Sequence, residues 1–243
     1  MGLDITRLVG KKTIENLIMN IYIIIPAYNE DKTIGGVISG IRSNYPDYKV
    51  VVVDDGSNDN TYQQTLAAGV KVLSHLINRG QGAAIGTGIK YALAKGAEII
   101  ITFDADGQHQ VADLSKIIRP IIENQAAVVL GSRFLSGTNQ IPLLRKIILK
   151  LGVIFTRIIS GVKLTDAHNG LRAFGRKAAE RINITQDRMA HSSEIIEEIK
   201  KNKLNFIEVP VTVNYTKYSL QKGQTAFDSL KIVKDILIKK ITK

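Results

Sequence analysis

The sequence has 243 residues, 44% of them hydrophobic, which suits one domain of ordinary size with a full core. It contains no cysteine, which excludes disulfides, a thiol nucleophile and a cysteine-based metal site, and its 4 histidines are not spaced as zinc ligands. The 33 Lys and Arg against 22 Asp and Glu give a net charge of +11, which suits a polyanionic partner such as nucleic acid, an anionic lipid surface or phosphorylated small molecules.

The first 135 residues predict an alternation of strands and helices. Residues 1–20 read as an amphipathic helix, and apolar runs that end in polar turns then alternate with helical periodicity. The expected strands are 21–25, 49–53, 70–74, 97–103 and 126–130, and the expected helices are 31–42, 58–68, 82–95 and 111–124. This order predicts an α/β fold with a mostly parallel central sheet and helices on both faces.

The alternation ends after residue 135. The pattern there predicts a long apolar helix with basic residues at 141–160, a polar loop at 165–172, helices at 176–182 and 192–202, and a strand at 204–214. A basic, glycine-containing loop at 217–224 and a second basic amphipathic helix at 226–242 follow. No window reaches the roughly 18 uncharged apolar residues of a membrane-spanning helix, and the start lacks the apolar run of a signal peptide, so we expect a cytoplasmic protein.

Two carboxylates directly follow the apolar run 99–103. Asp104 and Asp106 are one residue apart, with no Lys or Arg alongside, so they repel each other unless a cation lies between them. Ligands of open α/β sheets bind at the carboxyl ends of the strands, and Mg²⁺ is held by one or two carboxylates plus substrate phosphates. Gln108 adds a neutral oxygen. A solvated Asp turn is the alternative reading of such a pair in isolation.

Other strand ends carry residues that suit a nucleotide. Tyr28, between Pro26 and Glu30, can stack on a base or cover a ribose, and Asp55 can accept a hydrogen bond from a base N–H. The backbone N–H groups of residues 78–82, around Gly80, precede a helix and could hold an anion.

Together, IIPAYNE, VVDDGS, NRGQGAA and DADGQH resemble glycosyltransferase family 2, which has the GT-A fold, over about residues 21–215. The sequence is most similar to the polyprenyl-phosphate sugar synthase branch, in which G-S-R, an amphipathic helix, D-x-x-x-G-x-R-x-F and E-V-P follow in that order. This chain has them at 131–133, from 141, at 166–174 and at 208–210. The resemblance implies a nucleotide-binding part at 21–135, an acceptor part with its helices at 136–215, and a basic loop and helix at 216–243.

The resemblance also implies a role for each matching residue. The nucleotide is held by Pro26, Tyr28, Glu30, Asp55, Gly80, Asp104 and Ala105. Asp104, Asp106 and Gln108 bind Mg²⁺ or Mn²⁺, which bridges the donor diphosphate. Arg133 and Arg145 meet the acceptor phosphate, Asp166, Asn169 and Arg172 line the sugar side, and Lys222 belongs to a loop that closes over the donor.

The acceptor decides which residues are catalytic. The catalytic candidates are Asp106, Arg133 and Asp166. A lipid phosphate is already anionic at neutral pH and needs cations, which Arg133 and Arg145 could supply. A sugar hydroxyl needs a general base, for which Asp166 and Glu194 are the candidates. Inversion at the anomeric carbon is implied by the family.

We therefore expect a metal-dependent, inverting transferase that moves a sugar from a UDP- or GDP-sugar to a polyprenyl or dolichyl phosphate at the cytoplasmic membrane face. A transferase to a saccharide hydroxyl and a non-catalytic, membrane-associated nucleotide-sugar binder are the alternatives. Binding to nucleic acid is disfavoured because tryptophan is absent and no basic stripe carries exposed aromatics. Peripheral attachment to an anionic membrane surface is expected from the basic amphipathic helices at 141–160 and 226–242.

Overall fold

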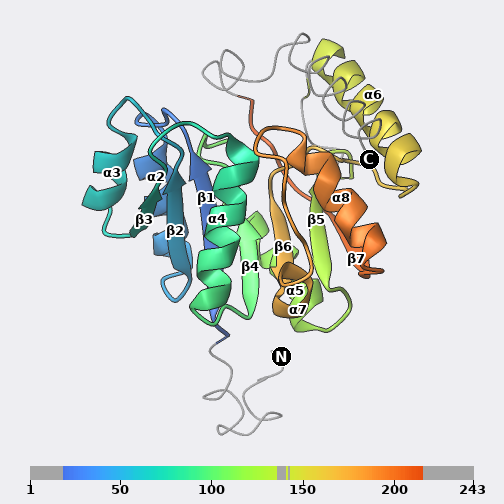
Figure 1. The fold of residues 1–243 in the computed structure, drawn as a ribbon, viewed down its shortest axis with the longest axis horizontal. Coiled ribbons are helices and arrows are strands. Elements are labelled where there is room, and N and C mark those ends of the chain that lie inside the picture. Colours follow the sequence, from blue (N-terminus) through green and yellow to red (C-terminus); the bar gives the residue numbers. More distant parts are fainter. Residues whose placement is uncertain (1–18, 136–140, 142, 216–243) are drawn as a thin grey trace, which may run out of the picture.

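The computed structural model describes residues 19–135, 141 and 143–215, and these form one sheet of seven strands covered by helices (Figure 1). The strand order is β3-β2-β1-β4-β6-β5-β7. The strands are β1 Ile21–Ala27, β2 Lys49–Asp54, β3 Lys71–Ser74, β4 Ile99–Thr102, β5 Val128–Ser132, β6 Arg172–Gly175 and β7 Phe206–Pro210. The helices are α2 Ile34–Asn44, α3 Thr61–Ala67, α4 Gln81–Ala94, α5 Asp113–Ile122, α6 Leu143–Ser160, α7 Arg176–Ala179 and α8 His191–Lys201.

The strands are apolar on both faces because each face is covered by helices. Alternate residues of β1, Ile21, Ile23 and Ile25, pack with the apolar sides of α2 and α5, while Tyr22 and Ile24 pack with α4, α7 and α8. Figure 1 shows α4, α7 and α8 in front of the sheet and α2 and α5 behind it. The arrangement confirms the predicted α/β class.

One strand was not predicted. β6 lies between β4 and β5 and runs antiparallel to both, whereas the sequence pattern suggested a loop at 165–172 followed directly by a helix. Four residues that begin with a buried arginine show no alternation, so only the distant pairing with β4 and β5 makes them a strand. The predicted strand at 204–214 is also shorter: β7 ends at Pro210, and Val213 pairs separately with His109.

The carboxyl ends of β1, β2, β4 and β5 meet at one edge of the sheet, because these strands all run in the same direction. Helix α6 lies beyond this edge and packs against α8 (Figure 1). Among the described residues, no helix combines the length and hydropathy that a membrane span requires. The predicted helices at 1–20 and 226–242, the loop at 217–224 and Lys222 lie largely or wholly outside the described residues.

Candidate active site

A cavity of about 370 Å³ opens at this edge of the sheet, and the strand ends singled out in the sequence line it. The predicted residues on its wall are Pro26, Tyr28, Glu30, Asp55, Gly80, Asp104, Ala105, Asp106, Gln108 and Arg133. Other lining residues were not predicted as site residues, among them Leu149 of α6, His168 and Gly170 of the loop before β6, Met189 just before α8 and His191 at its start. His168 and Gly170 lie within the 166–174 motif, which was the available signal for them. The positions of Leu149, Met189 and His191 depend on how α6 and α8 fold back on the sheet, which no local motif indicates.

Asp104 is held in place by neighbours on three sides. Its Oδ1 accepts a hydrogen bond from Gln81 Nε2 at 3.0 Å, and its Oδ2 lies 3.0 Å from His109 Nε2. A Cβ added to Gly170 would lie only 2.2 Å from the carboxylate, so the glycine backbone packs directly against it. Burial favours the neutral acid, but His109 and nearby positive charges outweigh it and hold the pKa of Asp104 below its usual range.

Asp106 has the opposite electrostatic character. Burial and the charge of Asp104 raise the pKa of Asp106 above its usual range. Gln108 donates to the same carboxylate through its backbone N–H at 3.0 Å and through its side-chain amide. Two carboxylates that repel each other in this way gain stability from a cation placed between them.

The donor set fits Mg²⁺ or Mn²⁺ held jointly with a substrate. Asp104, Asp106 and the Gln108 amide offer only oxygen ligands, provided that the amide turns its oxygen inward, and hard cations prefer such ligands. The part of the chain that the structure describes contains no group of three or more His, Cys, Asp or Glu that could hold an ion alone. Substrate phosphate and water would therefore complete the coordination.

Arg172 lies beneath the site rather than on its wall. Its Nε donates to the carbonyl of Asn169 at 2.9 Å and its Nη2 to the carbonyl of Ala167 at 3.0 Å, so it braces the loop before β6 from below. Burial lowers the pKa of Arg172 to about 10, which leaves it charged at neutral pH, and its field acts on Asp104. The acidic pair thus has an arginine nearby, although the local sequence shows none.

The backbone N–H groups of residues 78–82 were predicted to hold a ligand anion, and the structure shows two of them already bound within the chain. Asp55, only 2% exposed, accepts hydrogen bonds from the backbone N–H of Arg79 at 3.1 Å and of Gly80 at 2.6 Å. His75 Nδ1 lies 2.6 Å from the same carboxylate. Asp55 is therefore itself the anion at this helix end, where the helix dipole favours negative charge.

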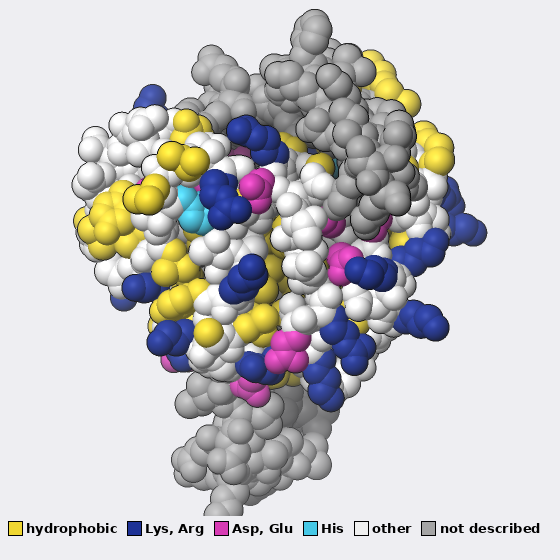
Figure 2. Space-filling model, viewed as in Figure 1, with side chains coloured by type: hydrophobic (Ala, Val, Ile, Leu, Met, Phe, Trp, Pro, Cys, Tyr) yellow, Lys and Arg dark blue, Asp and Glu magenta, His cyan; other side chains and the backbone are white. Residues whose placement is uncertain are grey.

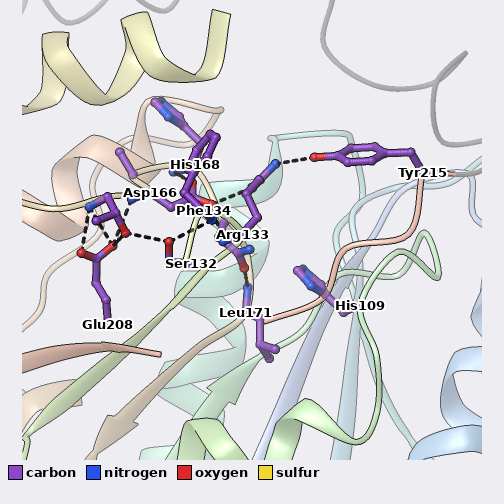
Figure 3. A network of polar contacts seen from close by, with 12 residues as sticks. His109, Ser132, Arg133, Phe134, Asp166, His168, Leu171, Glu208 and Tyr215 are labelled. Carbon is purple, nitrogen blue, oxygen red and sulfur yellow. Dashed lines mark hydrogen bonds and ion pairs between the residues drawn. The ribbon is translucent and has the colours of Figure 1, made fainter. Parts of the chain in front are cut away.

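Arg133 reaches the cavity from the end of β5, and Asp166 holds it there (Figure 3). Its Nε donates to Asp166 at 2.6 Å, its backbone N–H donates to the same carboxylate at 3.1 Å, and its Nη1 donates to Tyr215 at 3.3 Å. Burial disfavours the charge, but Asp166 and Tyr215 outweigh it and keep the pKa of Arg133 above its usual range. The pair presents a permanently charged guanidinium to the cavity.

Besides Arg172, three residues that the sequence assigned to the sugar or acceptor side do not line the cavity. Asp166 is buried and paired with Arg133, and Asn169 is buried with its amide oxygen accepting from the backbone of Leu171. Glu194 accepts the backbone N–H groups of Thr185 and Gln186, at 2.9 and 2.8 Å, and so anchors the segment before α8. The side chain of Arg145, within α6, is outside what the structure describes.

Two histidines on the wall are electrically neutral at physiological pH. Burial lowers the pKa of both His168 and His191 to about 4. The charge of Arg172 opposes protonation of each ring as well. They therefore offer hydrogen-bonding nitrogens without competing with Arg133 for an anion.

Comparison with protein families agrees with this geometry. The model of a family described as "Glycosyl transferase family 2" matches residues 22–182. The chain is 40% identical over 227 residues to an uncharacterised protein of Methanocaldococcus jannaschii, covering 91% of this chain and 92% of that protein. It is 38% identical over 245 residues to a UDP-N-acetylglucosamine–dolichyl-phosphate N-acetylglucosaminyltransferase of Methanococcus voltae, covering 92% and 97%. It is 30% identical over 204 residues to an undecaprenyl-phosphate mannosyltransferase of Micrococcus luteus, covering 80% and 83%.

A solved structure shares the fold. Glucosyl-3-phosphoglycerate synthase of Mycobacterium tuberculosis, crystallised with Mn²⁺, UDP and glucosyl-3-phosphoglycerate, superimposes with a TM-score of 0.70, covering 92% of this chain and 79% of that chain. Its sequence identity is 15%, so the likeness concerns the fold. It confirms the expected GT-A architecture.

Proposed function

The chain belongs to glycosyltransferase family 2, within its polyprenyl-phosphate sugar synthase branch, and from this premise we propose the reaction it catalyses. The donor is a nucleoside diphosphate sugar, linked to UDP or GDP. The acceptor is the phosphate of a polyprenyl or dolichyl lipid, and the anomeric configuration is inverted. The names of the relatives from Methanococcus voltae and Micrococcus luteus support this acceptor.

The observation that carries the proposal is the state of the groups around Arg133. A hydroxyl acceptor requires a general base at the cavity, but of the two carboxylates named as candidates Asp166 is paired with Arg133 and Glu194 is bound to backbone N–H groups. The wall histidines His168 and His191 have pKa values of about 4 and are therefore weak bases. A phosphate acceptor requires a cation, and the buried, charged guanidinium of Arg133 supplies one. These contacts favour a phosphate nucleophile over a sugar hydroxyl.

The donor is held on the opposite side of the same cavity. We propose that the nucleoside lies against Pro26, Tyr28 and Glu30. Asp55 holds the turn at Gly80, against which the base would lie. Asp104 and Asp106, with Gln108, hold Mg²⁺ or Mn²⁺, which when bound stabilises the negative charge of the leaving diphosphate. Arg133 orients the attacking phosphate oxygen toward the anomeric carbon.

The exposed apolar side of α6 supports the proposal that the protein acts at an anionic membrane surface, which we place at the cytoplasmic face. Its outward residues Leu143, Ile147, Leu151, Ile154 and Ile158 recur at helical spacing and are between 48% and 76% exposed. Figure 2 shows hydrophobic side chains along the outer edge of the molecule where α6 lies, with basic side chains below them. Leu149, on the same helix, lines the cavity, so the helix would bring the cavity close to lipid headgroups.

The test is a transfer assay with radiolabelled UDP- and GDP-sugars, Mn²⁺, and either polyprenyl phosphate or soluble oligosaccharides as acceptor. We expect label to enter the organic phase with polyprenyl phosphate and one of the two nucleotides. Label that appears only in oligosaccharide would refute the lipid acceptor and support the hydroxyl acceptor. Binding of a nucleotide sugar without any transfer would support the non-catalytic alternative.

A further inference from the structure

Glu208 lies on β7, outside the residues that line the cavity, yet its carboxylate binds the loop that carries Asp166 (Figure 3). It accepts the backbone N–H of Thr165 at 2.8 and 2.9 Å, the Thr165 hydroxyl at 2.8 Å and the backbone N–H of Asp166 at 3.0 Å. Because β7 pairs in parallel with β5, Glu208 lies opposite Leu130. The carboxylate therefore ties the loop to β7, which pairs with β5, the strand that ends just before Arg133.

The hydroxyl groups around Glu208 form a chain with a single direction. A hydroxyl carries one hydrogen, so Thr165 Oγ1, which donates to Glu208, must accept from Ser132 Oγ at 2.7 Å. Ser132 Oγ in turn accepts the backbone N–H of Phe134 at 3.2 Å. The chain thus runs from the turn around Arg133 to the carboxylate of Glu208, and each group named here as facing Glu208 donates to it.

The same loop holds the guanidinium. Asp166, whose N–H is bound by Glu208, accepts both the Nε and the backbone N–H of Arg133. A displacement of Thr165 or Asp166 therefore changes where Arg133 enters the cavity. Two links, one through Asp166 and one through Ser132, connect Glu208 to the same arginine.

We propose that Glu208 is a positioning residue that aims Arg133 at the acceptor phosphate. The inference rests on the proposed function, in which Arg133 binds that phosphate. Glu208 acts through Thr165 and Asp166 and touches neither substrate.

The first test is Glu208→Gln, which preserves the size of the side chain. The new amide nitrogen is a donor and must face another donor, the N–H of Thr165 or of Asp166, so the loop has to shift. We expect the KM for a short-chain, water-soluble prenyl phosphate to rise roughly tenfold. The affinity for UDP–Mn²⁺ or GDP–Mn²⁺, whichever the wild type binds, should change less than about twofold, because the donor side is built from other strands.

A readout without substrate separates this inference from the proposed function. In nuclear magnetic resonance spectra, the Nε–H signal of Arg133, assigned with Arg133→Lys, should shift in Glu208→Gln. Glu180→Gln is the matched control, because Glu180 pairs with Arg176 Nε at 2.9 Å on the surface. This control should move only the Arg176 signal and leave the KM unchanged.

An unmoved Arg133 signal together with an unchanged KM in Glu208→Gln would overturn the inference. If the wild type does not use prenyl phosphate but the Arg133 signal moves, the proposed acceptor is wrong while Glu208 still positions Arg133.

Should Glu208→Gln fail to fold, Thr165→Val breaks only the hydroxyl chain and Thr165→Ser keeps it. We expect a raised KM in the valine variant alone, and equal values in both variants and the wild type would equally overturn the inference.

Discussion

Replacement of Asp55 by alanine tests whether this carboxylate anchors the protein as well as the nucleotide. Asp55 is buried at the N-terminus of α4 and receives two backbone N–H groups, with His75 Nδ1 also at hydrogen-bond distance. A hydrogen bond to a charged acceptor contributes roughly 1.5–3 kcal/mol. The alanine variant also leaves the N–H groups of Arg79 and Gly80 without their acceptor.

Because these contacts are not additive, we expect a loss of about 3–5 kcal/mol in the free energy of unfolding. For a chain of this length each kcal/mol lowers the melting temperature by roughly 2–4 °C, so Asp55→Ala should melt about 10 °C below the wild type. Calorimetric melting curves measure this shift. Titration calorimetry with UDP–Mn²⁺ and GDP–Mn²⁺ below the melting temperature measures any further effect on nucleotide binding.

Asp187→Ala is the control, since Asp187 contacts the same loop through the Arg79 side chain at 3.3 Å, with both partners half exposed. Such a surface pair contributes at most about 1 kcal/mol. The reasoning would be refuted if Asp55→Ala melted within about 2 °C of the wild type, and weaker nucleotide binding alone would then make Asp55 a ligand residue only.

Further predictions concern the metal, acid stability and the membrane. Asp106→Ala should abolish transfer, with a melting temperature near that of the wild type, because it removes a proposed metal ligand; activity that survives both this change and a chelator would exclude the metal site. His168 and His191 have pKa values of about 4 when folded and roughly 6.5 when unfolded, so only the unfolded chain gains protons as the pH falls through this range. Each histidine should therefore lower the free energy of unfolding by about 2 kcal/mol at pH 5 relative to pH 7. A urea unfolding midpoint that is the same at pH 5 and pH 7 would contradict this. Ile147→Ser combined with Leu151→Ser should weaken flotation with anionic liposomes at low salt, and equal flotation of variant and wild type would exclude α6 as the contact.

The predictable parts of the fold are those whose secondary structure follows from the pattern of neighbouring residues in the sequence. The apolar runs that end at Ala27, Asp54 and Thr102 are buried strands, and the predicted alternation gives the sheet with helices on both faces. β6 was not predicted from the sequence, because its four residues become a strand only by pairing with β4 and β5, which are far away in the sequence. Pairing over such distances leaves no periodic signal in a short segment.

The site shows the same division. Residues at the ends of the parallel strands, such as Asp104 and Asp106, were predictable because the topology brings these ends together. The acidic character of Asp166 and Glu194 makes them base candidates in the sequence, but whether a carboxylate is free or occupied depends on its neighbours in the fold. For Asp55 the sequence showed an acceptor, and only the structure showed that backbone donors of its own chain already use it.

The close packing of Gly170 against Asp104 has a consequence for how strongly the two substrates affect each other's binding. No layer of atoms separates the loop before β6, which we propose lies on the acceptor side, from the carboxylate of Asp104, which we propose faces the donor, since even a methyl group would overlap it. A shift of the loop at Gly170 must therefore displace the Asp104 carboxylate, and a shift of the carboxylate must displace the loop. Thermodynamic linkage makes this effect reciprocal: if bound donor raises the affinity for acceptor by some factor, bound acceptor raises the affinity for donor by the same factor. The two substrates are thus expected to bind as a coupled pair rather than as independent ligands.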